Sequence, residues 1–120
     1  MKKRIMVVDD SRIMEYQIRK LLEGTDYEVT AYCENGEEAI ARYGEVQPDA
    51  VTMDIIMPGI DGLETAQVLM YEHSEARIIM ISSLGDDEML QEVYGIGAQG
   101  VLFKPLTKEA LLGALKKALS

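Results

Sequence analysis

Cysteine and long apolar runs are the features this sequence most clearly lacks. Cys33 is the single cysteine, so no intrachain disulfide can form, and a reducing cytoplasmic compartment is expected. The apolar run at residues 78–81 is far too short to cross a membrane. The charged first residues lead directly into a short strand-like run, where a signal peptide would need a longer apolar stretch. We therefore expect a cytoplasmic chain with no membrane attachment.

Basic residues and histidine are also scarce. Twelve Lys and Arg residues stand against twenty-one Asp and Glu residues, which gives a net charge of −9. Because neutralising phosphates requires clustered basic side chains, this balance argues against binding to nucleic acid or anionic membrane. The single histidine, His73, lies in the polar stretch 72–75, and we expect an exposed loop residue outside any functional site.

What the sequence has is a repeated alternation of short apolar runs and amphipathic stretches. Its 120 residues, of which 48% are hydrophobic, suit one compact domain with a real core. Five strand–helix units predict an α/β fold, a parallel sheet covered by helices on both faces. The expected strands are near residues 5–8, 29–33, 50–53, 78–81 and 101–103, and the expected helices near 14–22, 35–43, 61–69, 86–94 and 107–119.

Capping residues mark where several of these helices begin. Ser11 or Asp10 can cap the first helix, and Thr107 the last. Asn35 with Glu38 has the spacing of a capping box, in which each side chain bonds the backbone N–H of the other residue.

Polar side chains that could carry chemistry follow four of the five predicted strands. Because function in an open parallel sheet gathers at the carboxyl ends of the strands, these residues are expected at one edge. Taken singly, each has an ordinary explanation as a helix cap, a turn residue or an exposed charge. The group consists of Asp9, Asp10, Asp54, Ser82, Ser83 and Lys104.

Three carboxylates crowded at one edge repel one another by several kcal/mol per close pair. One lysine cannot balance them, so either a carboxylate holds a proton or a dication such as Mg²⁺ is bound. Aspartate can attack phosphorus as a nucleophile, and phosphoryl transfer mainly needs alignment and charge neutralisation. A metal, an ammonium and a hydroxyl supply these, so the cluster is typical of a site that accepts a phosphoryl group.

The chain resembles the receiver domain of bacterial two-component response regulators, of the stand-alone type, over essentially its whole length. The matching segments are residues 7–11, 53–62, 81–83, 97–98 and 103–105. The resemblance implies a flavodoxin-like (βα)5 three-layer sandwich whose strand order is 2-1-3-4-5. It also implies that residues 1–120 form a single receiver domain.

The resemblance assigns a metal site to four residues. Asp10 would bind Mg²⁺ (or Mn²⁺) directly, and Asp9 would hold the metal or its waters. Asp54 and the backbone carbonyl of Ile56 would complete the protein ligands.

The phosphoryl chemistry is implied by the same resemblance. Asp54 looks like the phosphorylated residue, Ser82 would donate to the phosphoryl group, and Lys104 would pair with Asp54 and then with the phosphate. Ser83 is small and would leave the site open. The Lys104–Pro105 peptide is often cis in the family. Such a domain is not an enzyme beyond promoting its own phosphorylation and dephosphorylation.

The implied partners are a sensor histidine kinase or histidine phosphotransfer protein as donor, a downstream target protein and a phosphatase. The target would be bound by the face formed by the fourth helix, fifth strand and fifth helix. Val101 stands where the family usually has Tyr or Phe, which puts the aromatic part of the switch in question. We expect Phe103 to lie on the opposite face of its strand, in the core, and Tyr94 is a candidate to fill the gap.

Two apolar residues near the site suggest a long-lived acyl phosphate. Ile56 and Leu84 occupy positions that tune its hydrolysis in the family, and our hypothesis is that they hinder the attacking water.

Other readings of the sequence stay open. An aspartate-nucleophile phosphatase or mutase usually has a second acid where this chain has Ile56. A flavin-binding flavodoxin-like protein needs a phosphate cradle where Asp9 and Asp10 stand, and a yellow colour would reveal it. A receiver excised from a longer DNA-binding or enzymatic regulator is the third alternative, although the start at Met1 and the end after the fifth helix favour a complete protein. The pathway, chemotaxis or phosphorelay, is left open.

Overall fold

The computed structural model describes residues 1–83 and 87–120, and strands alternate with helices throughout them. The predicted order of elements is confirmed, with boundaries that differ by a few residues. The elements are β1 (Lys3–Val8), α1 (Arg12–Leu21), β2 (Tyr27–Cys33), α2 (Gly36–Val46), β3 (Ala50–Asp54), α3 (Gly62–Glu72), β4 (Ile78–Ser82), α4 (Asp87–Gly95), β5 (Gly100–Phe103) and α5 (Lys108–Ala118).

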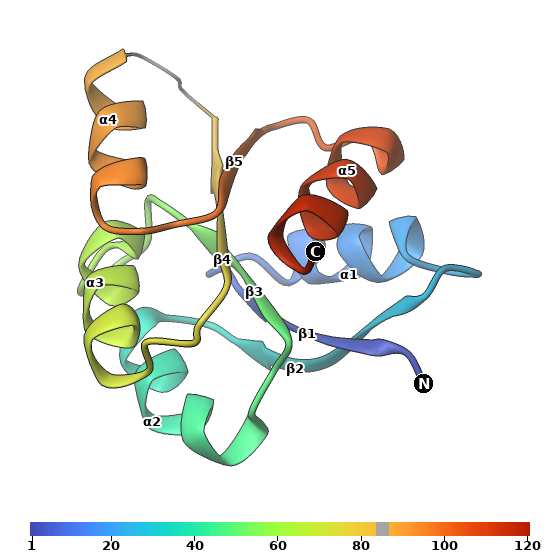
Figure 1. The fold of residues 1–120 in the computed structure, drawn as a ribbon, viewed down its shortest axis with the longest axis horizontal. Helices are drawn as coiled ribbons and strands as arrows, with labels where there is room; N and C mark the ends of the chain where they lie inside the picture. Colours follow the sequence, from blue (N-terminus) through green and yellow to red (C-terminus); the bar gives the residue numbers. More distant parts are fainter. Residues whose placement is uncertain (84–86) are drawn as a thin grey trace.

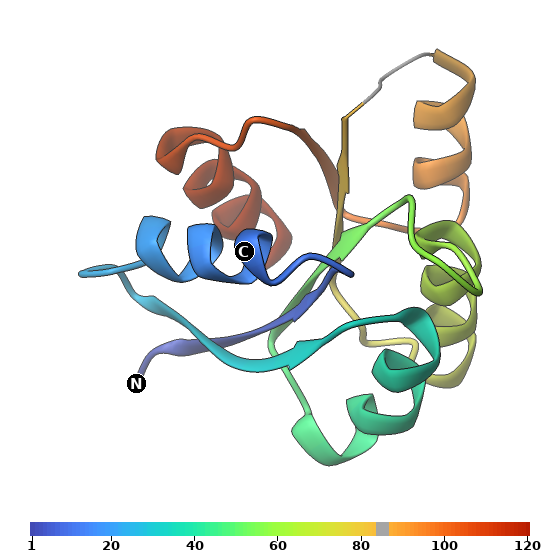
Figure 2. The same cartoon turned by 180° about the vertical axis from the view of Figure 1, so that it is seen from behind.

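The strands form one parallel sheet in the order β2-β1-β3-β4-β5, as the resemblance implied. Helices α1 and α5 cover one face, and α2, α3 and α4 cover the other (Figure 1). The view from behind shows the same three layers (Figure 2). Strand order reverses between β1 and β3, and ligands of such sheets bind beside the carboxyl ends of the strands at that point.

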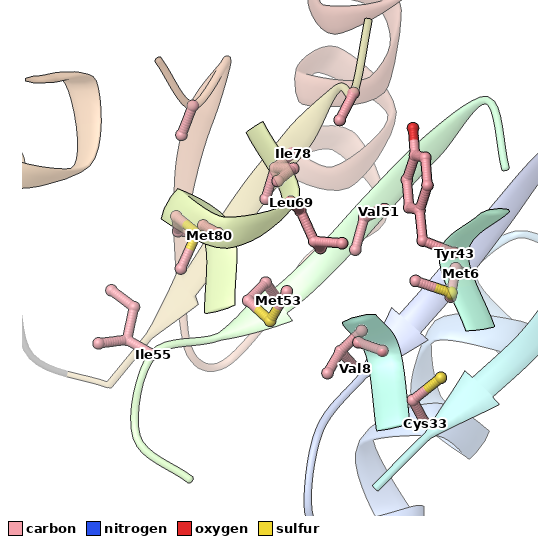
Figure 3. Packing of buried hydrophobic residues seen from close by; sticks show 14 of the residues in the cluster. Met6, Val8, Cys33, Tyr43, Val51, Met53, Ile55, Leu69, Ile78 and Met80 are labelled. Carbon is pink, nitrogen blue, oxygen red and sulfur yellow. The ribbon is translucent and has the colours of Figure 1, made fainter. Parts of the chain in front are cut away.

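The central strands are buried on both faces because their side chains alternate between two apolar layers. Met6 and Val8 of β1 join the layer under α2, α3 and α4, whereas Ile5 and Val7 join the layer under α1 and α5. Figure 3 shows the first layer, in which side chains of β1, β3 and β4 pack with Leu69 of α3. This double-sided core holds the strand ends rigidly in place.

The helix starts agree in part with the predicted caps. Thr107 accepts from the backbone N–H of Ala110, as expected. The Asn35 side chain accepts from the backbone N–H of Glu38, but the Glu38 carboxylate accepts from Glu34 and not from Asn35. The expected capping box is therefore only half formed.

Ser11 occupies the N-cap position of α1, but its side chain makes no capping hydrogen bond, so that prediction was wrong. The Asp9 side chain instead accepts from the Ser11 backbone N–H. Asp86, where the fourth helix was expected to begin, lies outside the described residues.

Two other predictions were wrong. Phe103 is 44% exposed and not in the core. It lies two residues after Val101, so the alternation of a strand places both on the same face, beside the open edge of β5. His73, the C-cap residue of α3, is half-buried and not exposed as expected, because its ring packs 4.4 Å from the ring of Tyr43 in α2.

None of the helices in residues 1–83 and 87–120 combines the length and the apolar character needed to cross a membrane.

Candidate functional site

Three aspartates meet at the carboxyl edge of the sheet, where the sequence placed them. Asp9 follows β1, Asp10 comes next, and Asp54 is the last residue of β3. Each offers a carboxylate oxygen, and these oxygens lie within 4.8 Å of one another. Asp9 and Asp54 are buried, at 1% and 6% exposure, whereas Asp10 is exposed. The parallel register explains the meeting, since it pairs Val8 with Met53.

The surroundings of Asp9 disfavour the ionised form of its carboxyl. One of its oxygens, Oδ1, accepts from the backbone N–H of Ser11 at 2.9 Å. The other, Oδ2, is buried and has no hydrogen-bond partner in the described part of the chain. Burial raises the pKa of this carboxyl to about 6. The hydrogen bond from the Ser11 N–H lowers the pKa, and the negative charge of Asp54 raises it. A buried carboxylate oxygen with no partner is suited to a cation.

Asp54 has a balance of opposing influences. Burial raises its pKa, while the Lys104 ammonium and the backbone N–H of Ile56 act in the other direction, and the charge of Asp10 raises it. Lys104 Nζ lies 3.6 Å from Asp54 Oδ2. The ion pair expected from the sequence is therefore present.

Lys104 is brought to Asp54 by the end of β5. Its backbone N–H donates to the carbonyl of Ser82 at 2.9 Å, which ties the segment after β5 to the end of β4. The Lys104–Pro105 peptide is cis.

Ser82 ends β4 and is buried, at 3% exposure. Its hydroxyl is 3.6 Å from Met89 Sδ, a contact that joins the end of β4 to α4. Ser83 is exposed, and Leu84, the residue expected to influence hydrolysis, lies outside the described residues.

Ile56 lies next to the Asp54 carboxylate, and its predicted roles as a carbonyl ligand and in hydrolysis stay predictions. Its backbone N–H donates to the Asp54 carboxylate, so this part of the backbone lies beside Asp54. Ile56 is 67% exposed.

Two residues that support the site were missed in the sequence. A side chain at Gly62 would overlap the backbone carbonyl of Asp54, so glycine lets α3 begin directly against the strand end. The Gly62 N–H also donates to the carbonyl of Ile55 at 2.7 Å. Tyr32 of β2 donates its hydroxyl to the backbone carbonyl of Asp9 at 2.7 Å. The Asp61–Gly62 pair was a usable signal, but nothing in the sequence pointed to Tyr32.

The edge strand β5 carries no aromatic side chain at the switch position. Val101 is half-buried and packs against the layer under α2, α3 and α4. Met89 packs against the same layer, whereas Tyr94 is 55% exposed. Tyr94 therefore does not fill the place of the missing ring in this structure.

The donor set fits a small hard dication. Three carboxylates from two strand ends supply oxygen ligands of the kind that Mg²⁺ and Mn²⁺ prefer. Within residues 1–83 and 87–120, Asp9 Oδ2 has no hydrogen-bond partner and Lys104 is the ammonium paired with Asp54, so the three carboxylates keep negative charge that a dication would neutralise.

Comparison with known proteins agrees with this geometry. The family model for the response regulator receiver domain matches residues 5–116. The chain is 39% identical to the chemotaxis protein CheY of Listeria monocytogenes over 96% of this chain and 97% of the relative. It is 38% identical to CheY of Bacillus subtilis over 98% of both. The chain thus belongs to the response regulator receiver domain family, whose members are signalling domains of two-component systems.

Solved structures show the same fold. The CheX–CheY–BeF3–Mg²⁺ complex from Borrelia burgdorferi contains a chain with a TM-score of 0.93 and 28% identity, covering 98% of this chain and 90% of that one. The response regulator domain of Thermotoga maritima CheB gives a TM-score of 0.90 at 29% identity, covering 99% and 97%.

Proposed function

We propose that residues 1–120 form one phospho-accepting receiver domain in which Asp54 receives a phosphoryl group from a phosphohistidine donor. The donor is a sensor histidine kinase or a histidine phosphotransfer protein. The convergence of Asp9, Asp10 and Asp54 beside Lys104 supports this proposal more than any other observation.

The proposed cofactor is Mg²⁺ or Mn²⁺, held by Asp9, Asp10, Asp54 and the backbone carbonyl of Ile56. When bound, the dication neutralises charge on the phosphoryl oxygens. A cation at this point would also offset the burial, and the lesser repulsion between carboxylates, that raise the pKa of Asp9 and of Asp54. The Mg²⁺ and BeF3 present in the Borrelia complex are consistent with this assignment.

In the proposed reaction, a carboxylate oxygen of Asp54 attacks phosphorus while the bond from phosphorus to the donor imidazole nitrogen breaks. The leaving imidazole takes a proton from solvent, and Asp54 becomes an acyl phosphate. Lys104 moves its ion pair from the carboxylate to the phosphoryl group, and the Ser82 hydroxyl donates to a phosphoryl oxygen. No general base is needed, because the carboxylate is already ionised when it attacks.

Phosphorylation shifts the conformational equilibrium of the domain toward the state that interacts better with the phosphoryl group. The free energy of this shift cannot exceed the difference in interaction energy between the two states. Ser82 and Lys104 are proposed to couple the site to α4 and β5. A downstream protein would bind the face formed by α4, β5 and α5, and a phosphatase is a further partner. The proposed location is the cytoplasm.

The proposal is tested by incubating the protein with acetyl phosphate and Mg²⁺ and locating any added mass. We expect one phosphoryl group on Asp54, no addition in Asp54→Asn, and suppression by EDTA. Asp26→Asn is the matched control, because Asp26 is exposed and lies just before β2, beside the start of β1 and so at the end of the strands opposite to the site. A phosphoryl group on another residue, or its persistence in Asp54→Asn, would contradict the proposal.

We further propose that the apolar residue Ile56, which is exposed and follows Asp54 by two positions, slows hydrolysis by hindering the attacking water. Ile56→Asn should shorten the lifetime of the acyl phosphate, measured as loss of the phosphorylated mass after the donor is removed. An unchanged lifetime would count against this role.

A further inference from the structure

Tyr32 contacts the site through its hydroxyl, and the proposed chemistry does not use it. We propose that Tyr32 is a positioning residue, which holds the peptide between Asp9 and Asp10 so that both carboxylates face the same cation. This inference rests on the proposed function, because it concerns the cation site assigned there. Its basis is a contact from β2 that reaches the end of β1.

Both backbone groups of Asp9 are held by neighbouring residues of β2. Its N–H donates to the carbonyl of Cys33 at 3.0 Å, an extension of the sheet. Its carbonyl accepts from the Tyr32 hydroxyl at 2.7 Å, beyond the point where the β1–β2 ladder ends at Val8 and Cys33. The tyrosine therefore supplies a hydrogen bond that the sheet no longer provides.

The bond acts on both metal ligands at once. The carbonyl of Asp9 and the N–H of Asp10 belong to one planar peptide unit. Fixing the carbonyl therefore fixes the direction in which the chain continues into Asp10. The Asp9 side chain is held separately, since its Oδ1 accepts from the Ser11 N–H, and its buried Oδ2 has no hydrogen-bond partner among the described residues.

The tyrosine ring is itself held in place. The Arg12 guanidinium lies over it, 5.0 Å from the ring centroid. Arg12 in turn pairs with Glu34 at 3.6 Å and with Glu15 at 3.4 Å. The backbone carbonyl of Tyr32 accepts from Arg42 at 2.9 Å. With ring and backbone both anchored, the hydroxyl is presented to the Asp9 carbonyl with little freedom.

The test is the affinity for Mn²⁺, measured by titration calorimetry on the purified metal-free protein. Tyr32→Phe removes only the hydroxyl and keeps the ring under Arg12. Removal of a residue that orients a metal ligand typically weakens binding by about 10–100-fold, and we expect about tenfold here. Tyr27→Phe is the matched control, since Tyr27 begins the same strand at the opposite edge of the sheet, and its affinity should stay within about twofold of wild type.

Urea unfolding of the metal-free proteins accompanies the titrations. If Tyr32 only packs against the core, Tyr32→Phe lowers stability and leaves the Mn²⁺ affinity unchanged, which would overturn the inference. If the wild type itself binds no Mn²⁺, or if Asp54→Asn binds it as tightly as wild type, the proposed cation site fails and the inference with it. If the wild type binds Mn²⁺ and Tyr32→Phe binds it with equal affinity, the inference about Tyr32 is overturned while the proposed cation site stands.

Discussion

Replacing Asp9 by Asn should stabilise the metal-free protein at neutral pH, although it removes a proposed metal ligand. Asp9 is 1% exposed, and burial raises the pKa of its carboxyl from the ordinary 3.8 to about 6. The folded state therefore holds this proton more tightly than the unfolded state does. The contribution of Asp9 to stability is greatest below pH 3.8, falls as the pH rises toward about 6, and stays low above that.

The size of the effect follows from the two pKa values. Each pH unit between them corresponds to about 1.4 kcal/mol, so ionised Asp9 costs the folded state about 3 kcal/mol at pH 8. Asparagine keeps an oxygen for the Ser11 N–H and carries no charge. Asp9→Asn should therefore gain up to about 3 kcal/mol in EDTA at pH 8, and little or nothing at pH 4.

The assay is urea unfolding of wild type and variant from pH 4 to pH 8, once in EDTA and once with Mg²⁺. With Mg²⁺ the advantage of Asp9→Asn should shrink or reverse, because the cation stabilises the wild type by binding its folded state. Asp26→Asn, at an exposed position, is the control for the Asp-to-Asn substitution itself. A metal-free Asp9→Asn variant that is no more stable than wild type at pH 8 would refute the reasoning.

Further predictions concern the backbone, the ion pair and the thiol. Gly62→Ala should lower the free energy of unfolding in urea by about 1–3 kcal/mol, because the added Cβ overlaps the Asp54 carbonyl. In the control Gly113→Ala the added Cβ has no atom within 4 Å, so this variant should be more stable by about 0.5–1 kcal/mol. Equal effects of the two substitutions would contradict the packing argument. Lys104→Met should leave phosphorylation by acetyl phosphate partly intact. The changes in amide chemical shift that phosphorylation causes in α4 and β5, measured by NMR, should be smaller than in wild type. Changes as large as in wild type would argue against coupling through the Lys104–Asp54 pair. Burial raises the pKa of the Cys33 thiol to about 11. A thiol reagent at pH 8 should therefore react with the urea-unfolded chain and hardly at all with the native protein. Rapid labelling of the native protein would contradict this prediction.

Much of the site could be predicted because strand periodicity and chain direction carry the information. Alternating strands and helices imply parallel strands, and the residues after parallel strands must meet at one edge. The order of strands and helices in the sequence therefore predicts that Asp9, Asp10 and Asp54 lie together, and their carboxylate oxygens do lie within 4.8 Å of one another. The same rule places Lys104 at this edge, whereas its pairing with Asp54 was implied by the resemblance.

Contacts across the sheet could not be predicted in this way. The bond from Tyr32 to Asp9 depends on how far β2 extends beside β1, and the packing of His73 on Tyr43 depends on where α2 and α3 end. The prediction that Phe103 lies in the core was wrong. The apolar character of a residue does not show whether another element of the fold covers its side of an edge strand.

The sequence alone determined which side chains would gather, because periodicity and strand direction are local properties of the chain. Only the tertiary structure decided that Asp9 is buried while the adjacent Asp10 is exposed, and so which carboxylate has its pKa raised to about 6. Burial is set by the elements that pack around a residue. Those elements come from distant parts of the chain, and their positions are fixed only when the whole domain is assembled.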